Sequence, residues 1–207
     1  LSCLVGSEMC IRDSFVADID DDGDLDIISA DGSGDKILYH INDGTPDNGA
    51  WTTNTVISGS DADGAMSVHV ADIDSDGDLD IVAALFMTSH VVWIENDGSP
   101  NNGGWTSHDV VSSSSSKESY DVTVADIDGD GDLDILEADQ SNKIYWYEND
   151  GTPDDGTWSM TKIKGGLTDA QVVATADLDN DGDIDVISGA YTANKISWHL
   201  NDGTPGD

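Results

Sequence analysis

The chain has 207 residues, of which 43 are acidic and 7 are basic, and its formal net charge at pH 7 is −36. This charge argues against nucleic acid as a partner, because phosphate binding needs lysine and arginine, and it disfavours anionic membrane surfaces. Six tryptophans and many valines and isoleucines recur at ordered intervals, so the disorder that such acidity can produce is not expected. No stretch approaches the roughly 20 apolar residues of a membrane span.

The first 14 residues are interpreted as a leader that is not native to the fold. The segment "SEMCIRDS" (Ser7 to Ser14) resembles the translation of an adapter used to prepare sequencing libraries, so residues 1–14 are excluded from fold reasoning. Both cysteines, Cys3 and Cys10, lie in this leader and carry no redox conclusion. The remaining sequence has no cysteine, which is compatible with export.

The rest of the sequence repeats with a period of about 54 residues. The segment "VADIDDDGDLDI" from Val16 recurs from Val70, from Val124 and, as "TADLDNDGDIDV", from Thr175. Each copy is followed by an "NDGTP" or "NDGSP" motif and, in the first three copies, by a tryptophan. The sequence therefore predicts four tandem units, the last of them partial, at residues 15–68, 69–122, 123–173 and 174–207.

Each unit is expected to form four short strands. In the third unit these are Tyr120–Asp126, Leu133–Ala138, Lys143–Glu148 and Trp158–Ile163, separated by segments rich in turn formers. No segment has helical spacing over ten residues or more. Four antiparallel strands in tandem repetition are typical of the blades of a β-propeller, in which neighbouring blades cover each other's faces. We expect an all-β, incomplete propeller of about four blades.

The loop after the first strand carries closely spaced aspartates. In the third unit Asp126, Asp128 and Asp130 occupy positions 1, 3 and 5, Gly131 occupies position 6 and Asp134 position 9. Carboxylates this close repel one another unless a cation lies between them. Hard oxygens at positions 1, 3 and 5, a glycine for the sharp turn and a backbone carbonyl at position 7 are what a wrapped calcium loop requires.

Other metal sites fit these loops less well. An EF-hand would close with a glutamate at position 12, and only Glu137 of the third unit meets that condition. A cage of four carboxylates suits calcium better than magnesium, and zinc, nickel and copper favour histidine or cysteine. We expect about four Ca²⁺ ions, one per repeat. The alternatives are solvated acidic turns, and calcium that serves only stability.

The aspartate loops and the trailing "ENDG" motif resemble FG-GAP/VCBS-type repeats, which are related to the calcium-binding blades of integrin α-subunit β-propellers. The resemblance covers residues 15 to 207. It implies that five aspartates of each loop form the metal site, the fourth of them through its carbonyl. These residues are Asp18, Asp20, Asp22, Asp24, Asp26, Asp72, Asp74, Asp76, Asp78, Asp80, Asp126, Asp128, Asp130, Asp132, Asp134, Asp177, Asp179, Asp181, Asp183 and Asp185.

A protein or glycan ligand is expected on the face opposite the calcium loops. In a four-stranded blade the loops after the first and third strands share one face, so the other loops emerge on the opposite face. Those loops vary between units, and variation on a rigid scaffold suits a binding surface. The alternative is ordinary loop drift. The candidate residues are Phe86, Met87, His90, Tyr120, Gln140, Asn142, Tyr191 and Asn194.

The expected function is calcium-dependent adhesion or ligand binding outside the cell, within a larger secreted or surface protein. Many acidic residues lie outside the aspartate loops, and the salt of an extracellular environment would screen their charge. No nucleophile elbow, HExxH motif or phosphate-cradling loop is present, so an enzyme is not expected. A propeller-type polysaccharide lyase or hydrolase remains an alternative, although only 7 basic residues could serve it. A purely structural, calcium-stabilised scaffold is the other alternative.

Overall fold

The computed structural model describes residues 11–49, 51–111 and 118–205. Fifteen strands form four antiparallel sheets, three with four strands and one with three. Within each sheet the strands follow one another in chain order, so every connection is a hairpin between neighbours. The only helices among the described residues are short 3-10 turns. The all-β prediction is confirmed.

The strand bounds fix where the loops lie. The first sheet holds β1 (Ile11–Ala17), β2 (Asp26–Asp31), β3 (Lys36–Ile41) and β4 (Thr52–Ser58). The second holds β5 (Ala65–Ala71), β6 (Asp80–Leu85), β7 (His90–Asn96) and β8 (Trp105–Val111). The third holds β9 (Ser119–Ala125), β10 (Asp134–Asp139), β11 (Lys143–Glu148) and β12 (Ser159–Gly165). The fourth holds β13 (Ala170–Ala176), β14 (Asp185–Ala190) and β15 (Lys195–His199). Each aspartate loop joins the first two strands of its sheet.

Four 3-10 turns complete the description. They are η1 (Pro46–Asn48), η2 (Gly59–Asp61), η3 (Pro100–Asn102) and η4 (Pro153–Asp155). Three of them begin at the proline of the NDGTP or NDGSP motif, where a fixed φ favours the start of a helical turn. The turn ends at a glycine in the left-handed region in each of these three cases, as at Gly103 with φ +83°.

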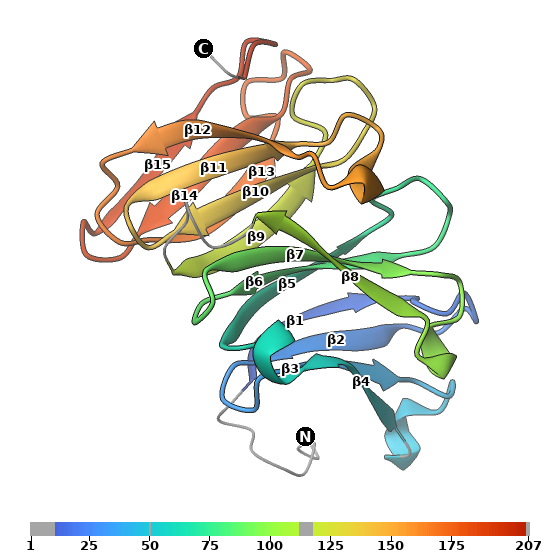
Figure 1. Cartoon of the computed structure of the whole chain (residues 1–207). Helices are drawn as coiled ribbons and strands as arrows, with labels where there is room; N and C mark the ends of the chain where they lie inside the picture. Colours follow the sequence, from blue (N-terminus) through green and yellow to red (C-terminus); the bar gives the residue numbers. More distant parts are fainter. Residues whose placement is uncertain (1–10, 50, 112–117, 206–207) are drawn as a thin grey trace.

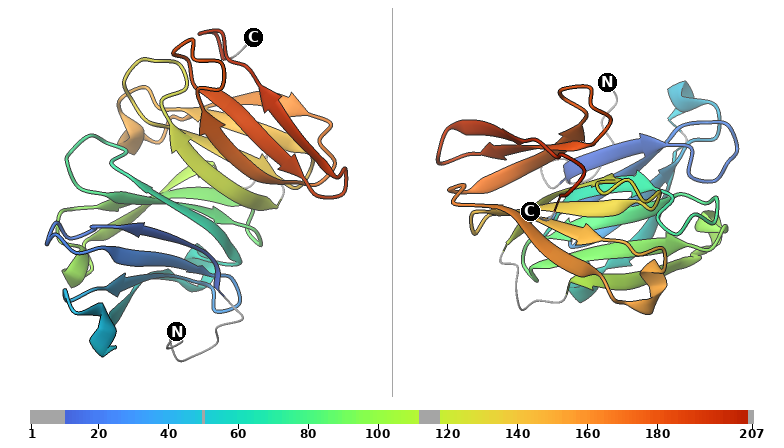
Figure 2. Two further views of the ribbon diagram at one scale, coloured as in Figure 1. Left: turned by 180° about the vertical axis from the view of Figure 1, so that it is seen from behind. Right: turned by 90° about the horizontal axis from the view of Figure 1, so that it is seen from above.

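The four sheets succeed one another like blades (Figure 1). The first strands of consecutive sheets, β1, β5, β9 and β13, contact one another along the inner side (Figure 2). The first and fourth sheets lie at opposite ends of the row. This arrangement is that of consecutive blades of a propeller.

The core consists of three apolar clusters, and each lies between two consecutive sheets. Ile28 of β2 and Val68 of β5 belong to the first cluster, and Trp93 of β7 and Tyr147 of β11 to the second. The third joins the third sheet to the fourth. Each sheet therefore buries its apolar faces against its neighbours, as expected for repeats that do not form a core alone.

An aromatic residue on the third strand of each sheet is buried where a neighbouring sheet covers it. Tyr39, Trp93 and Trp146 occupy the same place on the third strand of their sheets and are 0%, 0% and 5% exposed. Trp198 occupies that place in the fourth sheet and is 66% exposed, because no described sheet covers it. The burial of the first three agrees with a role in packing between sheets.

The first strand begins inside the segment expected to be a leader. Residues 11–14 form the start of β1, and an oxygen of Asp13 accepts a hydrogen bond from the Val68 backbone N–H at 3.1 Å. The described sheets also begin a few residues before the predicted unit boundaries, because the first strand of each sheet extends further ahead of its aspartate motif than predicted. Residues 1–10, including Cys3 and Cys10, lie outside the described residues.

Candidate metal centre

Each aspartate loop is closed by the same hydrogen bond. The carboxylate at position 1 accepts the backbone N–H of the glycine at position 6, and the four N···O distances run from 3.0 to 3.3 Å. That glycine has φ between 93° and 104° in the four loops, a region that residues with a Cβ rarely enter. The structure confirms the predicted sharp turn, and each loop leads into a strand instead of the helix of an EF-hand.

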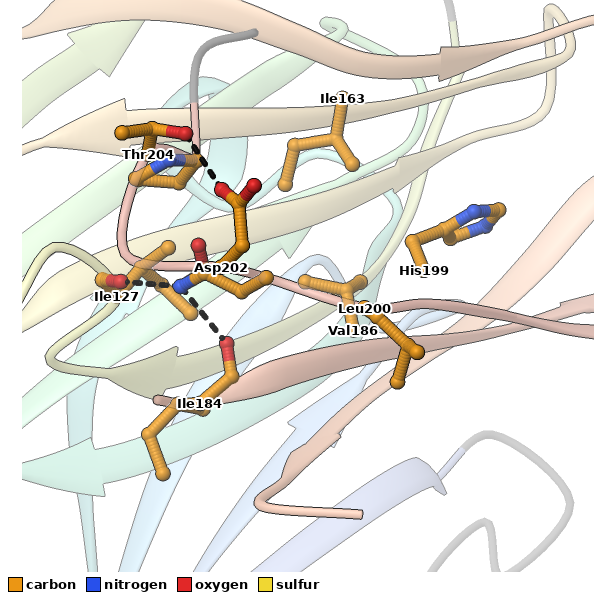
Figure 3. Close-up of a pocket in the computed structure, with 10 residues that line it drawn as sticks. Ile127, Ile163, Ile184, Val186, His199, Leu200, Asp202 and Thr204 are labelled. Carbon is orange, nitrogen blue, oxygen red and sulfur yellow. Dashed lines mark hydrogen bonds between the residues drawn. The ribbon is translucent and has the colours of Figure 1, made fainter. Parts of the chain in front are cut away.

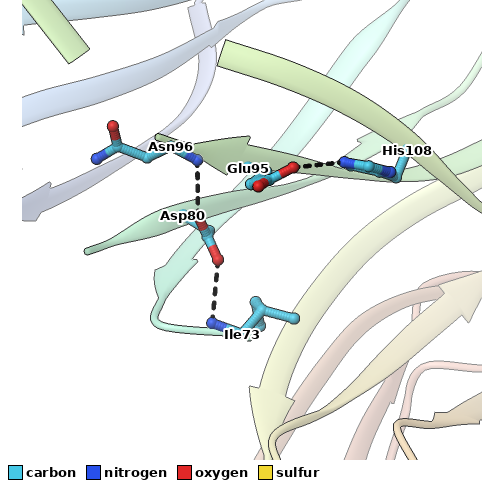
Figure 4. A network of polar contacts seen from close by, with 5 residues as sticks. All are labelled: Ile73, Asp80, Glu95, Asn96 and His108. Carbon is cyan, nitrogen blue, oxygen red and sulfur yellow. Dashed lines mark hydrogen bonds and ion pairs between the residues drawn. The ribbon is translucent and has the colours of Figure 1, made fainter. Parts of the chain in front are cut away.

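The aspartate at position 9 is fully buried in every loop. Asp80, at the start of β6, accepts the Ile73 backbone N–H at 3.1 Å and the Asn96 backbone N–H at 2.8 Å (Figure 4). The same pair of hydrogen bonds recurs at the other three loops. This carboxylate therefore ties the aspartate loop to the NDG loop of its own sheet.

Burial makes these carboxylates harder to ionise. It raises the pKa of Asp80 to about 7 and that of Asp134 to about 6, although their backbone N–H donors partly oppose the shift. The pKa of Asp26 is raised for the same reason. A cation beside such a carboxylate favours its charged form, so these positions are suited to a bound positive ion.

Three carboxylates of each loop come together. One oxygen of each lies within 4.8 Å of the others, which is close enough for a single ion to contact all three. The groups are Asp18, Asp20 and Asp22; Asp72, Asp74 and Asp80; Asp126, Asp128 and Asp134; and Asp177, Asp179 and Asp185. The remaining predicted ligands lie outside these groups and stay predictions.

The donor set fits calcium. All the grouped atoms are carboxylate oxygens, which hard cations prefer. In the first loop Oδ1 of Asp20 is buried and has no hydrogen-bond partner among the described residues, so an ion there would satisfy it. Asp18, Asp20 and Asp22 would hold the ion in that loop. When bound, the ion supplies charge neutralisation that holds the loop closed.

The sequence profile of FG-GAP-like repeats matches residues 18–83, 84–137 and 135–188. The chain belongs to the FG-GAP-like repeat family. A search of curated proteins finds no match. Among the described residues, no helix combines the length and the apolar character needed to cross a membrane.

Solved structures similar to this FG-GAP-like chain include a lectin of Agrocybe aegerita, with 25% identity and a TM-score of 0.60 over 92% of this chain and 49% of that one. An auxiliary nutrient binding protein of Bacteroides ovatus is 12% identical, with a TM-score of 0.58 over 93% of this chain and 45% of that one. A biofilm matrix protein of V. cholerae is 19% identical, with a TM-score of 0.50 over 93% of this chain and 31% of that one. The chain spans about half the length of the first two.

The asparagine of each NDG motif is a site residue that sequence reasoning missed. The side-chain N–H groups of Asn201 donate to the backbone oxygens of Ile184, in its own unit, and of Ile127, in the third unit. Asn149 makes the equivalent pair, reaching Ile73 of the second sheet at 3.1 Å. The sequence signal that could have identified this asparagine is its recurrence in every NDG motif. In the third and fourth FG-GAP-like units this residue links the unit to the aspartate loop of the unit before it.

The glycine of the NDG motif faces the aspartate at position 7. A Cβ on Gly151 would lie 2.8 Å from Oδ2 of Asp132, and the other sheets repeat this approach. The aspartate loops and the NDG loops therefore share one edge of the fold, as predicted. This edge is called the calcium edge below, and the edge formed by the β2–β3, β6–β7, β10–β11 and β14–β15 turns is called the variable edge.

A cavity of about 340 Å³ lies between the third and fourth sheets at the calcium edge (Figure 3). Ile127, Ile163, Ile184 and Val186 supply its apolar lining. Trp105 packs against the first apolar cluster and Trp158 against the second. Trp146 belongs to the third cluster, but among the described residues no tryptophan that follows an NDG motif packs against it.

Four of the eight predicted ligand-binding residues make contacts between sheets. The rings of Phe86 and Tyr120 meet edge to face at 6.0 Å. Gln140 donates to the Asp169 carboxylate at 2.8 Å, and Oδ1 of Asn142 accepts the Asp169 backbone N–H at 2.7 Å. The ring contact connects the second and third sheets, and the two hydrogen bonds connect the third and fourth, so a role in packing explains these residues.

The other four candidates lie at the hairpin turns of the variable edge. His90 lies 3.6 Å from the Asp109 carboxylate. Asn194 has φ +48°, a left-handed conformation that asparagine tolerates in turns. Met87 is 67% exposed and Tyr191 is 73% exposed. These last two are the candidates most available to a ligand.

Asp134→Ala is expected to remove one metal site and to destabilise the protein. The substitution leaves the N–H groups of Ile127 and Asn149 without their buried acceptor, at about 1–3 kcal/mol each. Calorimetric titration should then find three bound calcium ions instead of four. Asp132→Asn is the matched control, because the predicted ligand at this position is the backbone carbonyl, which the substitution keeps. Four unchanged binding events in Asp134→Ala would contradict the assignment.

Proposed function

We propose that this chain is a calcium-binding propeller module that binds a glycan or protein ligand, within a larger secreted or cell-surface protein. The observation that carries the proposal is a group of three carboxylates in each of four loops that lie at the same place in their sheets. The group uses positions 1, 3 and 9 in three loops and positions 1, 3 and 5 in the first. Membership of the FG-GAP-like family supports the same reading.

The proposed role of calcium is to hold the fold together. Position 1 closes the turn, and the buried aspartate at position 9 joins it to the NDG loop, so the ion would bridge both ends of the loop. An ion that binds only the folded chain adds its binding free energy to stability. The loops thus keep the first two strands of each sheet in place.

An extracellular location is supported by charge and by calcium supply. Extracellular calcium modules bind with Kd of roughly 10⁻⁴–10⁻³ M, a range that cytosolic calcium does not reach. A net charge of −36 is also better tolerated where salt screens it.

The proposed ligand is a glycan in the first instance. The similar lectin of Agrocybe aegerita recognises non-reducing terminal N-acetylglucosamine, and its identity of 25% is above that of the other two structures described. A glycan with that terminus is therefore the first probe. Met87 and Tyr191 would contact it at the variable edge, where both side chains are exposed.

We also propose that the module does not catalyse a reaction. Its grouped aspartates accept hydrogen bonds that close the loops, so they are not placed as lone acids or bases. A lyase would need a cluster of basic residues, and the sequence has 7 lysines and arginines in all. Release of shortened products from a polysaccharide incubated with the protein in Ca²⁺ would contradict this part of the proposal.

A glycan array probed in Ca²⁺ and in EDTA tests the function. Binding of oligosaccharides with terminal N-acetylglucosamine is expected in Ca²⁺ and should be lost in EDTA, because the scaffold loosens. Tyr191→Ala should weaken binding about tenfold or more, since exposed aromatic rings act as binding hot spots. Asn102→Ala, on the calcium edge, is the control and should bind like the wild type.

Two outcomes would contradict the proposal in different ways. Binding that survives both Tyr191→Ala and Met87→Ala would contradict the placement of the ligand at the variable edge. If no glycan bound although Ca²⁺ raised the melting temperature, the ligand proposal would fail and a structural scaffold would remain.

A further inference from the structure

One hydrogen bond joins an aspartate loop to the neighbouring sheet through side chains alone. Nδ2 of Asn101 donates to Oδ2 of Asp20 at 2.7 Å, although the two residues are 81 positions apart. Asp20 occupies position 3 of the first loop, and Asn101 lies in η3, which follows β7 of the second sheet. The second sheet therefore reaches a predicted metal ligand of the first.

The two oxygens of Asp20 have different surroundings. Oδ2 accepts the hydrogen bond from Asn101, whereas Oδ1 is buried and has no hydrogen-bond partner among the described residues. Asp20 also contributes an oxygen to the group formed with Asp18 and Asp22, within 4.8 Å. The amide thus holds one oxygen in place and leaves the other free for an ion.

We propose that Asn101 is a positioning residue of the first calcium site, through which the second sheet supports the metal centre of the first. This inference rests on the proposed calcium binding. Hydrogen bonds to a ligating carboxylate orient it, and their loss typically lowers metal affinity about 10- to 100-fold. Because coupling between binding and docking is reciprocal, an ion in the first loop also strengthens the contact between the two sheets.

The repeats vary at this position in a way that suggests a sharp test. The residue that follows the proline is Asp47 in η1, Asn101 in η3 and Asp154 in η4. Asn101→Asp therefore introduces the residue that other repeats carry here. A carboxylate beside Asp20 repels it when no metal is present and attracts a cation when one is.

The experiment is a calorimetric Ca²⁺ titration of the demetallated protein, with thermal melts in EDTA and in Ca²⁺. Asn101→Ala should weaken one of four binding events about tenfold or more and leave the other three unchanged. Asn101→Asp should lower the melting temperature in EDTA but retain or raise the affinity of that one event. Asn102→Ala, a neighbouring exposed residue of η3, should match the wild type in every measurement.

A role in packing alone gives a different result. Both Asn101 variants would then lose the same stability with and without Ca²⁺, and all four binding constants would stay at their wild-type values. That result would overturn the inference and leave calcium binding intact. A wild-type protein that takes up no Ca²⁺ would instead overturn the proposed function. If Asn101→Ala did not fold without metal, Asn101→Asp would test the inference alone. Its melting temperature should fall in EDTA, while its affinity for Ca²⁺ at the first site should be retained or raised.

Discussion

Removal of calcium by excess EDTA is expected to lower the melting temperature of this protein by about 20 °C or more. A site saturated at about 100 times its Kd adds about 2.7 kcal/mol to folding. Four such sites add about 11 kcal/mol, which is comparable with the whole stability of an ordinary domain, about 5–15 kcal/mol. Each kcal/mol shifts the melting temperature by about 2–4 °C in a chain of this size. Differential scanning calorimetry in about 10 mM Ca²⁺ and in EDTA measures the shift.

The control separates specific binding from charge screening. A chain with net charge −36 is stabilised by any added cation, so Mg²⁺ at the same concentration and NaCl at the same ionic strength are needed beside Ca²⁺. Only Ca²⁺ should restore the full melting temperature, because Mg²⁺ demands a stricter octahedral geometry and releases its water reluctantly. Equal recovery in NaCl would mean that screening, and not site binding, stabilises the protein.

Trp93→Ala is expected to destabilise the folded protein by about 3–5 kcal/mol, which corresponds to a fall of about 10 °C in melting temperature. Trp93 is 0% exposed and packs in the cluster between the second and third sheets. Its ring also stacks on that of His108, with centroids 4.5 Å apart. The substitution opens a cavity between two sheets, where their apolar faces meet.

Trp198→Ala provides a matched control for this prediction. Trp198 occupies the same place on the third strand of its sheet, but it is 66% exposed. Its loss should change stability by less than about 1 kcal/mol, since exposed positions away from special features usually have small effects. Melts of both variants in saturating Ca²⁺ compare them directly. If the melting temperature fell by a similar amount in both variants, these tryptophans would stabilise the protein through strand propensity and not through packing between sheets.

The metal loops were predictable because all their requirements are local. Asp126, Asp128 and Asp134 lie within nine residues of one another, and the glycine at position 6 is the residue that a φ near +103° demands. The period of about 54 residues then placed four such loops in equivalent sheets. The strand order within each sheet was also predictable, because each hairpin joins two strands that are consecutive in the chain.

Contacts between sheets could not be predicted from the sequence. The hydrogen bond from Asn149 to Ile73 joins residues 76 positions apart, and that from Asn101 to Asp20 joins residues 81 apart. Both depend on how one sheet is rotated against the next, which a repeat period does not specify. Asn149 recurs in every repeat, which could have indicated a structural role, whereas Asn101 occupies a position that varies between repeats.

Variation between repeats was also an incomplete guide to the ligand-binding surface. Asn142 has φ +83° at its hairpin turn, and its side chain accepts a backbone N–H of the fourth sheet. Turn geometry and packing can each select such a residue, so its difference from the equivalent residues does not require a ligand. Exposure, which only the structure provides, reduces the candidates chiefly to Met87 and Tyr191.

Anomalous diffraction from crystals grown in Ca²⁺ tests the central claim most directly. The account predicts one peak in each of the four aspartate loops. Each peak should lie about 2.3–2.6 Å from carboxylate oxygens at positions 1 and 3 and from the carbonyl at position 7. Well-ordered loops without anomalous density in saturating Ca²⁺ would contradict the claim that metal ions neutralise these carboxylates.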